Sequence, residues 1–212
     1  MTLSLKYAIV ILLCSNQLTR WVTLKTDRKG LELLSEYEPL PDVLFDIIPQ
    51  IYFPYIGRVL DAFTIIPILA CLSRLRYVHH PYAVPSKCIV TLAIVYIVRI
   101  VAFSVTILPS PNCVAGAPRV DAVGGCHDCI FSGHVSTALI VTLNTISIGG
   151  SIVWLAHPIV LSILLIATRM HYTIDIIVAW CFSVLAFTFS DKSECFSGNN
   201  SFCIESNSLF VT

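Results

Sequence analysis

Apolar residues gather in long runs along this chain of 212 residues, and short polar segments separate the runs. A helix needs about 20 mostly apolar residues to cross the hydrocarbon core of a bilayer. Five runs approach this length, and a sixth is short. In chain order the runs are residues 5–19, 51–72, 88–108, 131–148, 152–168 and 173–190. The pattern predicts an all-α, polytopic membrane helix bundle of about six transmembrane helices.

Two of these runs are less regular than the others. Residues 5–19 are short for a span and are also similar to the apolar region of a signal peptide. The run 51–72 is interrupted by Arg58 and Asp61. Gly149 and Gly150 separate the fourth and fifth runs, so these two are expected to form a helical hairpin. We predict three parts, namely a first span or signal-like segment (1–20), a membrane domain (21–192) and a C-terminal tail (193–212).

Composition agrees with a membrane protein and excludes one class of partner. The chain is 56% hydrophobic and 12% charged, whereas soluble domains carry about 25% charged residues. Its formal net charge is +0. Because a nucleic-acid binder would present a basic face, no nucleic-acid partner is expected.

The distribution of basic residues predicts the orientation in the membrane. The loop 73–87 contains several basic residues and no acid, which is typical of a cytosolic loop. The loops 109–130 and 169–172 then lie on the lumenal or outer side. This places His134 and His171 at the same membrane face, each near the N-terminus of a helix, where an anion such as phosphate is favoured.

The histidines are accompanied by groups suited to phosphoryl chemistry. His171 and Asp175 are four residues apart, so on a helix the carboxylate can accept the imidazole N–H and leave the other nitrogen as a nucleophile or base. His134 can protonate a leaving oxygen. In the same stretch, Ser132 can donate to a phosphoryl oxygen and Gly133 allows close approach of the backbone.

Two further features have more than one interpretation. Arg99 lies near the middle of its span and either pairs with a buried acid or supports the polar site. Cys113, Cys126 and Cys129 share one polar loop. A single C-x-x-C pair is weak evidence for zinc, so we expect either structural thiols or a lumenal disulfide there, and no metal or cofactor.

Four short motifs resemble the sphingolipid synthases, which include the sphingomyelin and inositol phosphorylceramide synthases, within the lipid phosphate phosphatase-like (PAP2) superfamily. In chain order the motifs are "EPLPD" (38–42), "RIVAFSVTILPSP" (99–111), "CHDCIFSGH" (126–134) and "HYTIDIIVAW" (171–180). They occur in the family's order. The resemblance therefore covers residues 38–190 and assigns 21–192 to a membrane catalytic domain.

The resemblance implies a reaction and the residues that perform it. His171 corresponds to the nucleophile, Asp175 to the residue that orients it and His134 to the second catalytic histidine. A phospho-head group would pass from a glycerophospholipid donor to the primary hydroxyl of a ceramide acceptor, with release of diacylglycerol and without a cofactor. The implied location is the Golgi or plasma membrane, with the site facing the lumen or exterior, and a homo-oligomer is possible.

The head group stays open between choline, ethanolamine and inositol. Asp128, Arg169 and Tyr172 are candidate substrate-binding residues beside Ser132, Gly133 and Arg99, and they suit either an inositol or a choline group. His127 stands where many family members have glycine.

Two other functions remain as alternatives. A lipid phosphate phosphatase would carry a Lys-x6-Arg-Pro motif and an Arg six residues before the second histidine, but Leu165 occupies that position. A catalytically silent lipid-binding membrane protein is the third possibility, although such a protein has no reason to keep both histidines and the acid.

Overall fold

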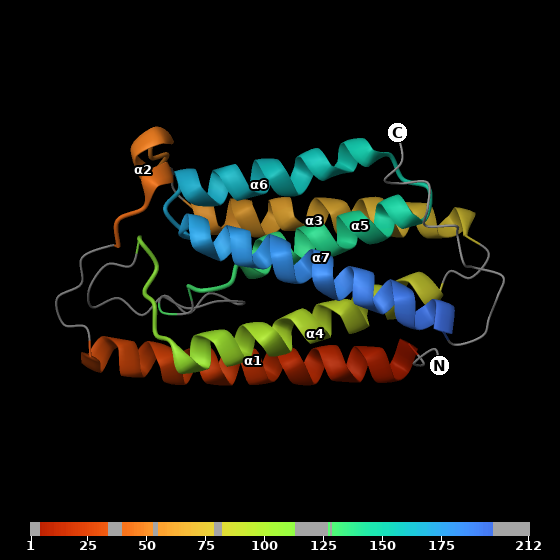
Figure 1. Ribbon diagram of the computed structural model, residues 1–212, viewed down its shortest axis with the longest axis horizontal. Coiled ribbons are helices and arrows are strands. Elements are labelled where there is room, and N and C mark those ends of the chain that lie inside the picture. Colours follow the sequence, from red (N-terminus) through yellow and green to blue (C-terminus); the bar gives the residue numbers. More distant parts are fainter. Residues whose placement is uncertain are drawn as a thin grey trace.

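The computed structural model describes residues 5–33, 40–52, 55–78, 82–112, 127 and 129–196. Its longer helices run along one common long axis (Figure 1). The elements are α1 (Leu5–Leu33), α2 (Val43–Ile47), α3 (Ile56–Arg74), η1 (Leu75–Tyr77), α4 (Ala83–Val105), α5 (Gly133–Ser147), η2 (Ile152–Leu155), α6 (Ala156–Ala167) and α7 (Thr173–Phe196). The predicted all-α membrane helix bundle is confirmed.

The number of predicted spans is not confirmed. By length and composition, three segments among the described residues can cross a bilayer, namely Ile56–Tyr77, Ala83–Val105 and Thr173–Ser190. Helices α5 and α6 have only 15 and 12 residues. At 1.5 Å per residue α5 is about 22 Å long, which is less than the roughly 30 Å thickness of the hydrocarbon core.

Helix α5 is the centre of the bundle and packs against α3, α4, α6 and α7 (Figure 1). Val135, Ala138 and Leu139 on this helix are fully buried. The chain turns back after α5 at Gly149, whose φ of +84° lies in the left-handed region that glycine adopts without strain. The expected break between the two runs therefore falls where the sequence predicts it.

Helix α1 lies beside α4 and is longer than the apolar run 5–19 indicates (Figure 1). It continues without a break through residue 20, the predicted limit of the first segment. Its buried face carries small residues at close to four-residue spacing, namely Ala8, Ser15, Thr19, Thr23, Thr26, Asp27 and Gly30. Small side chains let two helix backbones approach closely. Packing along this face, rather than hydrophobicity, accounts for the extra length.

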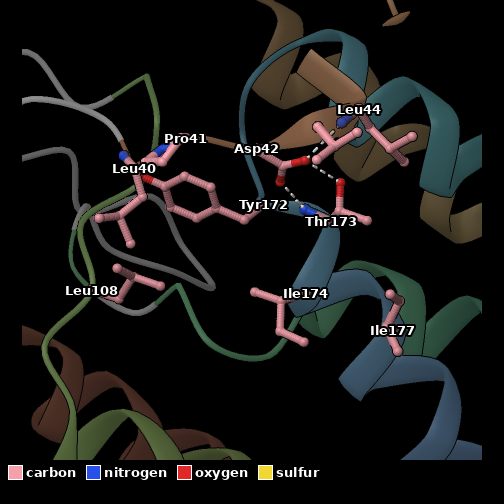
Figure 2. A pocket seen from close by; sticks show the side chains of 10 residues that line it. Leu40, Pro41, Asp42, Leu44, Leu108, Tyr172, Thr173, Ile174 and Ile177 are labelled. Carbon is pink, nitrogen blue, oxygen red and sulfur yellow. Dashed lines mark hydrogen bonds between the residues drawn. The ribbon is translucent and has the colours of Figure 1, made fainter. Parts of the chain in front are cut away.

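The short helix α2 is docked onto the start of α7 by Asp42, the last residue of the "EPLPD" motif (Figure 2). The Asp42 carboxylate accepts hydrogen bonds from the Leu44 N–H (3.0 Å), the Thr173 N–H (2.6 Å) and the Thr173 hydroxyl (2.6 Å). One side chain thus caps two helix N-termini. Burial acts to raise the pKa of Asp42, but hydrogen bonds from Thr173 and Leu44, together with the charge of Arg169, lower it below its ordinary value.

Arg169 holds the other end of α2. Its backbone is left-handed, with a φ of 56°. One guanidinium nitrogen donates to the carbonyl oxygens of Phe45 (2.7 Å) and Ile48 (3.0 Å), and the other donates to that of Ile166 (3.0 Å). The guanidinium also lies 4.1 Å from the centre of the Phe45 ring. The loop between α6 and α7 is therefore fixed against the segment that precedes α3.

Replacing Asp42 by alanine is expected to destabilise the protein by about 1–2 kcal/mol, the usual cost of losing a helix cap. Thermal unfolding in detergent micelles, followed by tryptophan fluorescence, measures this loss. Asp46→Ala is the matched control, because Asp46 is an exposed acid on the same helix.

The effect of Asp42→Ala should also depend on pH. Because the pKa of Asp42 is lowered on folding, its contribution is complete above the ordinary Asp pKa and is lost as the pH falls below that value. The difference in Tm between wild type and Asp42→Ala should therefore narrow between about pH 5 and about pH 3. A difference that stays constant over this range would contradict the capping role.

Candidate active site

An imidazole and a carboxylate are in contact at the start of α7. His171 Nδ1 lies 3.2 Å from Asp175 Oδ2, and the same oxygen accepts the Tyr172 N–H at 2.9 Å. The side chain of Asp175 is 0% exposed and that of His171 is 8% exposed. An ionised carboxylate can only accept a hydrogen bond, so we assign the N–H to Nδ1. This leaves the lone pair of Nε2 available for attack.

A second imidazole faces this pair from α5. His134 is the second residue of α5, and its ring centre lies 6.4 Å from that of His171 at an interplanar angle of 67°. The backbone ties the two helices together here, because the Ser132 N–H donates to the carbonyl oxygen of Asp175 (3.4 Å). The structure thus brings together all three predicted catalytic residues.

His134 has a carboxylate partner that the sequence analysis did not assign to the site. Asp61 Oδ1 on α3 lies 2.7 Å from His134 Nε2. The site therefore contains two histidine–aspartate pairs, one at the start of α7 and one between α5 and α3. Asp61 could have been found from the sequence as an acid within an apolar span, because ionisable groups in such segments are functional by default.

The start of α5, which carries His134, is positioned by Arg99, Gly133 and Ser132. Arg99 is 3% exposed, and its Nε donates to the carbonyl oxygen of Phe131 at 2.9 Å. A Cβ on Gly133 would lie 3.7 Å from the Arg99 guanidinium, which is an ordinary contact distance. The Ser132 hydroxyl is buried and accepts the Val135 N–H as the N-cap of α5. These contacts position the start of α5, and a direct contact with substrate stays a prediction for all three residues.

The other residues predicted to bind substrate are Tyr172, Arg169 and Asp128. Tyr172 is buried, and its hydroxyl accepts the Leu40 N–H at 3.1 Å. The guanidinium of Arg169 bonds to carbonyl oxygens as described above, so those donors stabilise α2 instead of being left for a phosphate. Asp128 lies outside the described residues, as does Glu38 of the first motif.

An open, mostly apolar groove of about 350 Å³ runs beside this site (Figure 2). Its lining residues are Leu40, Pro41, Asp42, Val43, Leu44, Leu108, Tyr172, Thr173, Ile174 and Ile177. Tyr172 directly follows His171 in the chain, so the groove adjoins the imidazole–carboxylate pair. Its size and composition suit a hydrocarbon chain.

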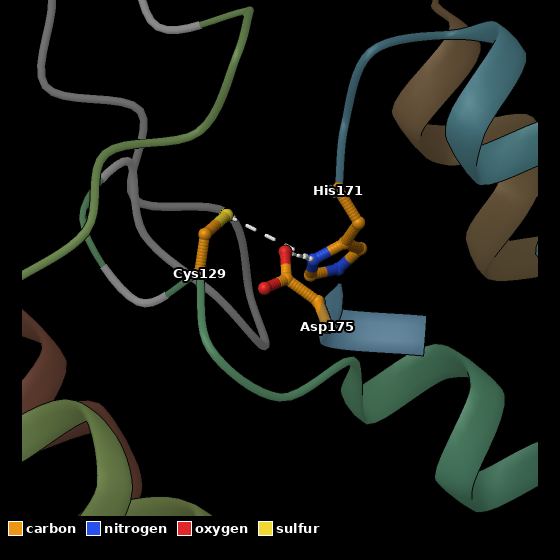
Figure 3. Close-up of side chains that lie close together, drawn as sticks. All are labelled: Cys129, His171 and Asp175. Carbon is orange, nitrogen blue, oxygen red and sulfur yellow. Dashed lines mark hydrogen bonds and ion pairs between the residues drawn. The ribbon is translucent and has the colours of Figure 1, made fainter. Parts of the chain in front are cut away.

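The loop before α5 contributes a thiol and a third histidine. Cys129 has a buried thiol whose sulfur lies 3.8 Å from His171 Nδ1 (Figure 3). Of the two expectations for the loop cysteines, Cys129 therefore fits the structural thiol, while Cys113 and Cys126 lie outside the described residues. His127 contacts α1 instead of the site, because its backbone N–H (2.8 Å) and its Nδ1 (3.2 Å) both meet Asp27 Oδ1.

Comparison with known proteins agrees with this geometry. A family model described as PAP2 superfamily C-terminal matches residues 125–192, the segment that carries both histidines. Phosphatidylinositol:ceramide inositolphosphotransferase 3 of Arabidopsis thaliana is 33% identical over 143 residues, which cover 51% of this chain and 49% of the relative. Inositolphosphotransferase 2 of the same plant is 30% identical over 146 residues, with 51% and 47% covered.

A rice protein of the same name, from Oryza sativa subsp. indica, is 30% identical over 145 residues, with 51% of this chain and 44% of the relative covered. The chain thus spans about half the length of the curated relatives it matches. Together with the four motifs, these similarities support a sphingolipid synthase family in the PAP2 superfamily for this chain.

Proposed function

We propose that this protein transfers phosphoinositol from phosphatidylinositol to the primary hydroxyl of ceramide and releases diacylglycerol. The observation that carries the proposal is the pair of imidazoles 6.4 Å apart, each held by its own carboxylate. The names of the relatives favour inositol over choline and ethanolamine as the head group.

In the first half-reaction, His171 Nε2 attacks the phosphorus of the donor. A nitrogen–phosphorus bond forms and the bond from phosphorus to the diacylglycerol oxygen breaks. Asp175 holds the Nδ1 proton and stabilises the positive charge that develops on the ring. A reacting phosphorus lies about 3 Å from its nucleophile, and the leaving oxygen lies about 2.8 Å from its proton donor. The two ring centres, 6.4 Å apart, are close enough for both rings to contact the same phosphodiester.

His134 carries the proton in both half-reactions. Asp61 holds Nε2–H, so Nδ1 is the nitrogen that faces the reacting oxygens. The protonated ring donates from Nδ1 to the departing diacylglycerol oxygen and becomes neutral. Ceramide then enters, Nδ1 takes the proton of its hydroxyl, and the ceramide oxygen displaces His171 from phosphorus. One phosphodiester replaces another, so no nucleotide is required.

The position of the site suits two substrates that remain in the bilayer. The apolar groove beside His171 would hold one hydrocarbon chain while the head group reaches the histidines. Arg74 donates to the Gly149 carbonyl oxygen (3.4 Å), just beyond the end of α5 opposite to His134. The basic loop 73–87 and the catalytic groups thus lie at opposite ends of α5, in keeping with a site on the lumenal or outer side of a Golgi or plasma membrane.

The proposed function is tested with the purified full-length chain in lipid nanodiscs that contain fluorescent ceramide. Separate discs supply phosphatidylinositol, phosphatidylcholine, phosphatidylethanolamine or phosphatidic acid. We expect inositol phosphorylceramide from the first disc, identified by mass spectrometry. Inorganic phosphate from phosphatidic acid, with no new sphingolipid, would instead show a lipid phosphate phosphatase, and ceramide binding without turnover would show a silent lipid-binding protein.

The nucleophile is tested by His171→Ala and Asp175→Asn. We expect His171→Ala to abolish transfer and Asp175→Asn to reduce it by about 10²- to 10⁴-fold, because the asparagine amide no longer stabilises the correct tautomer. His157→Gln is the control, since His157 lies on α6 and its Nε2 meets the Phe63 carbonyl instead of the site. Full activity in either site variant would contradict the mechanism.

The role of Asp61 is tested by Asp61→Asn beside His134→Ala. Loss of the carboxylate should lower kcat by about ten- to a hundredfold, less than the loss of the imidazole itself, and leave KM nearly unchanged. Asp61→Glu should restore part of the activity. An equal loss of kcat in Asp61→Glu and Asp61→Asn would mean that the carboxylate does not act through His134.

A further inference from the structure

Three potential metal ligands from two segments meet at one buried point. The Cys129 sulfur, His171 Nδ1 and an oxygen of Asp175 all lie within 4.8 Å of one another, and all three residues are buried (Figure 3). The sulfur lies 3.8 Å from Nδ1, and Nδ1 lies 3.2 Å from Asp175 Oδ2. The ligands of a tetrahedral zinc site, bound at about 2.0–2.3 Å, are separated by roughly 3.2–3.6 Å. These two observed distances therefore need only small shifts.

The electrostatics of this point favour a divalent cation. The carboxylate is fully buried, and its second oxygen, Oδ1, has no hydrogen-bond partner among the described residues. A neutral thiol, a neutral imidazole and this carboxylate together carry a charge of −1. If Zn²⁺ replaces the thiol proton and the imidazole keeps its proton on Nε2, so that Nδ1 binds the metal, the group becomes neutral, which is favourable where burial penalises net charge.

We propose that Cys129, His171 and Asp175 form a binding site for Zn²⁺ that inhibits the enzyme. Binding breaks the S–H bond and releases that proton to solvent, while the imidazole proton moves from Nδ1 to Nε2. Bonds then form from sulfur, Nδ1 and a carboxylate oxygen to the metal. Water occupies the fourth position. A thiolate and an imidazole select zinc over Mg²⁺ or Ca²⁺, which prefer oxygen ligands.

Inhibition follows from the nitrogen that the metal occupies. With the metal on Nδ1, the imidazole proton lies on Nε2, so Nε2 no longer has a lone pair for attack on phosphorus. This consequence rests on the proposed role of His171. The existence of the metal site does not rest on it, because binding is measurable without turnover.

The direct test uses Co²⁺ as a spectroscopic substitute for zinc in the purified full-length protein, after treatment with EDTA. A cobalt–thiolate charge-transfer band in the near ultraviolet is expected in wild type. It should disappear in Cys129→Ala and Cys129→Ser, while Cys181→Ser is the control because its exposed thiol lies elsewhere on α7. His171→Ala should weaken cobalt binding by about 100-fold or more. A missing band in wild type, or one that persists without Cys129, would overturn the site.

The inhibition is measured on transfer to ceramide. Zinc should inhibit wild type reversibly, and EDTA should restore the rate. Each Cys129 variant is compared with its own rate in the absence of metal, and measurable transfer in that state shows that the variant folds. The variants should require about 100-fold more zinc for the same fractional inhibition. Equal sensitivity of wild type and Cys129→Ser would refute the inhibitory role. A protein that shows the cobalt band but no transfer would retain the metal site and disprove the proposed function instead.

Discussion

The burial of the Asp175 carboxylate constrains the whole site. An ionised carboxylate without partners costs several kcal/mol when it is removed from water. Asp175 meets this requirement with the His171 ring N–H and the Tyr172 backbone N–H, both from the turn just before α7. The turn therefore has one favourable conformation, and that conformation directs Nε2 of His171 away from the acid. Through its carbonyl oxygen the same residue also receives the N–H of Ser132, so the position of α5 relative to α7 depends on it as well.

Several polar residues near Asp175 stabilise the backbone and have no reacting atom in the proposed mechanism. Asp42 joins α2 to α7, Arg169 fixes the α6–α7 loop, and Arg99 holds the carbonyl of Phe131 just before α5. Each of these side chains carries a charge and lies near the site. Each nevertheless makes hydrogen bonds to backbone groups that would otherwise lack partners. In the proposed function, charge neutralisation at phosphorus falls mainly to the two imidazoles.

The sequence predicted the parts of the site that depend on local geometry. The four-residue spacing of His171 and Asp175 predicted their contact, although His171 lies two residues before α7 and meets Asp175 from the preceding turn. The position of His134 at the same end of the helix bundle was predicted from the order of the apolar runs alone. The partners Asp61 and Cys129 were not predicted, because they lie 73 and 42 positions from the histidines they meet, and only packing brings such residues together. The length of α1 was underestimated for a related reason, since small residues on its buried face do not register as an apolar run.

The two histidine–aspartate pairs differ in their exposure. The side chain of Asp175 has no exposed surface, whereas that of Asp61 is 46% exposed and that of His134 is 20% exposed. In the proposed function, this burial would suppress hydrolysis of a phosphorylated His171, because water is excluded there. The more exposed His134–Asp61 pair would exchange its proton between turnovers. Under this proposal, the asymmetry gives a physical basis for transfer of the head group to an alcohol in preference to water.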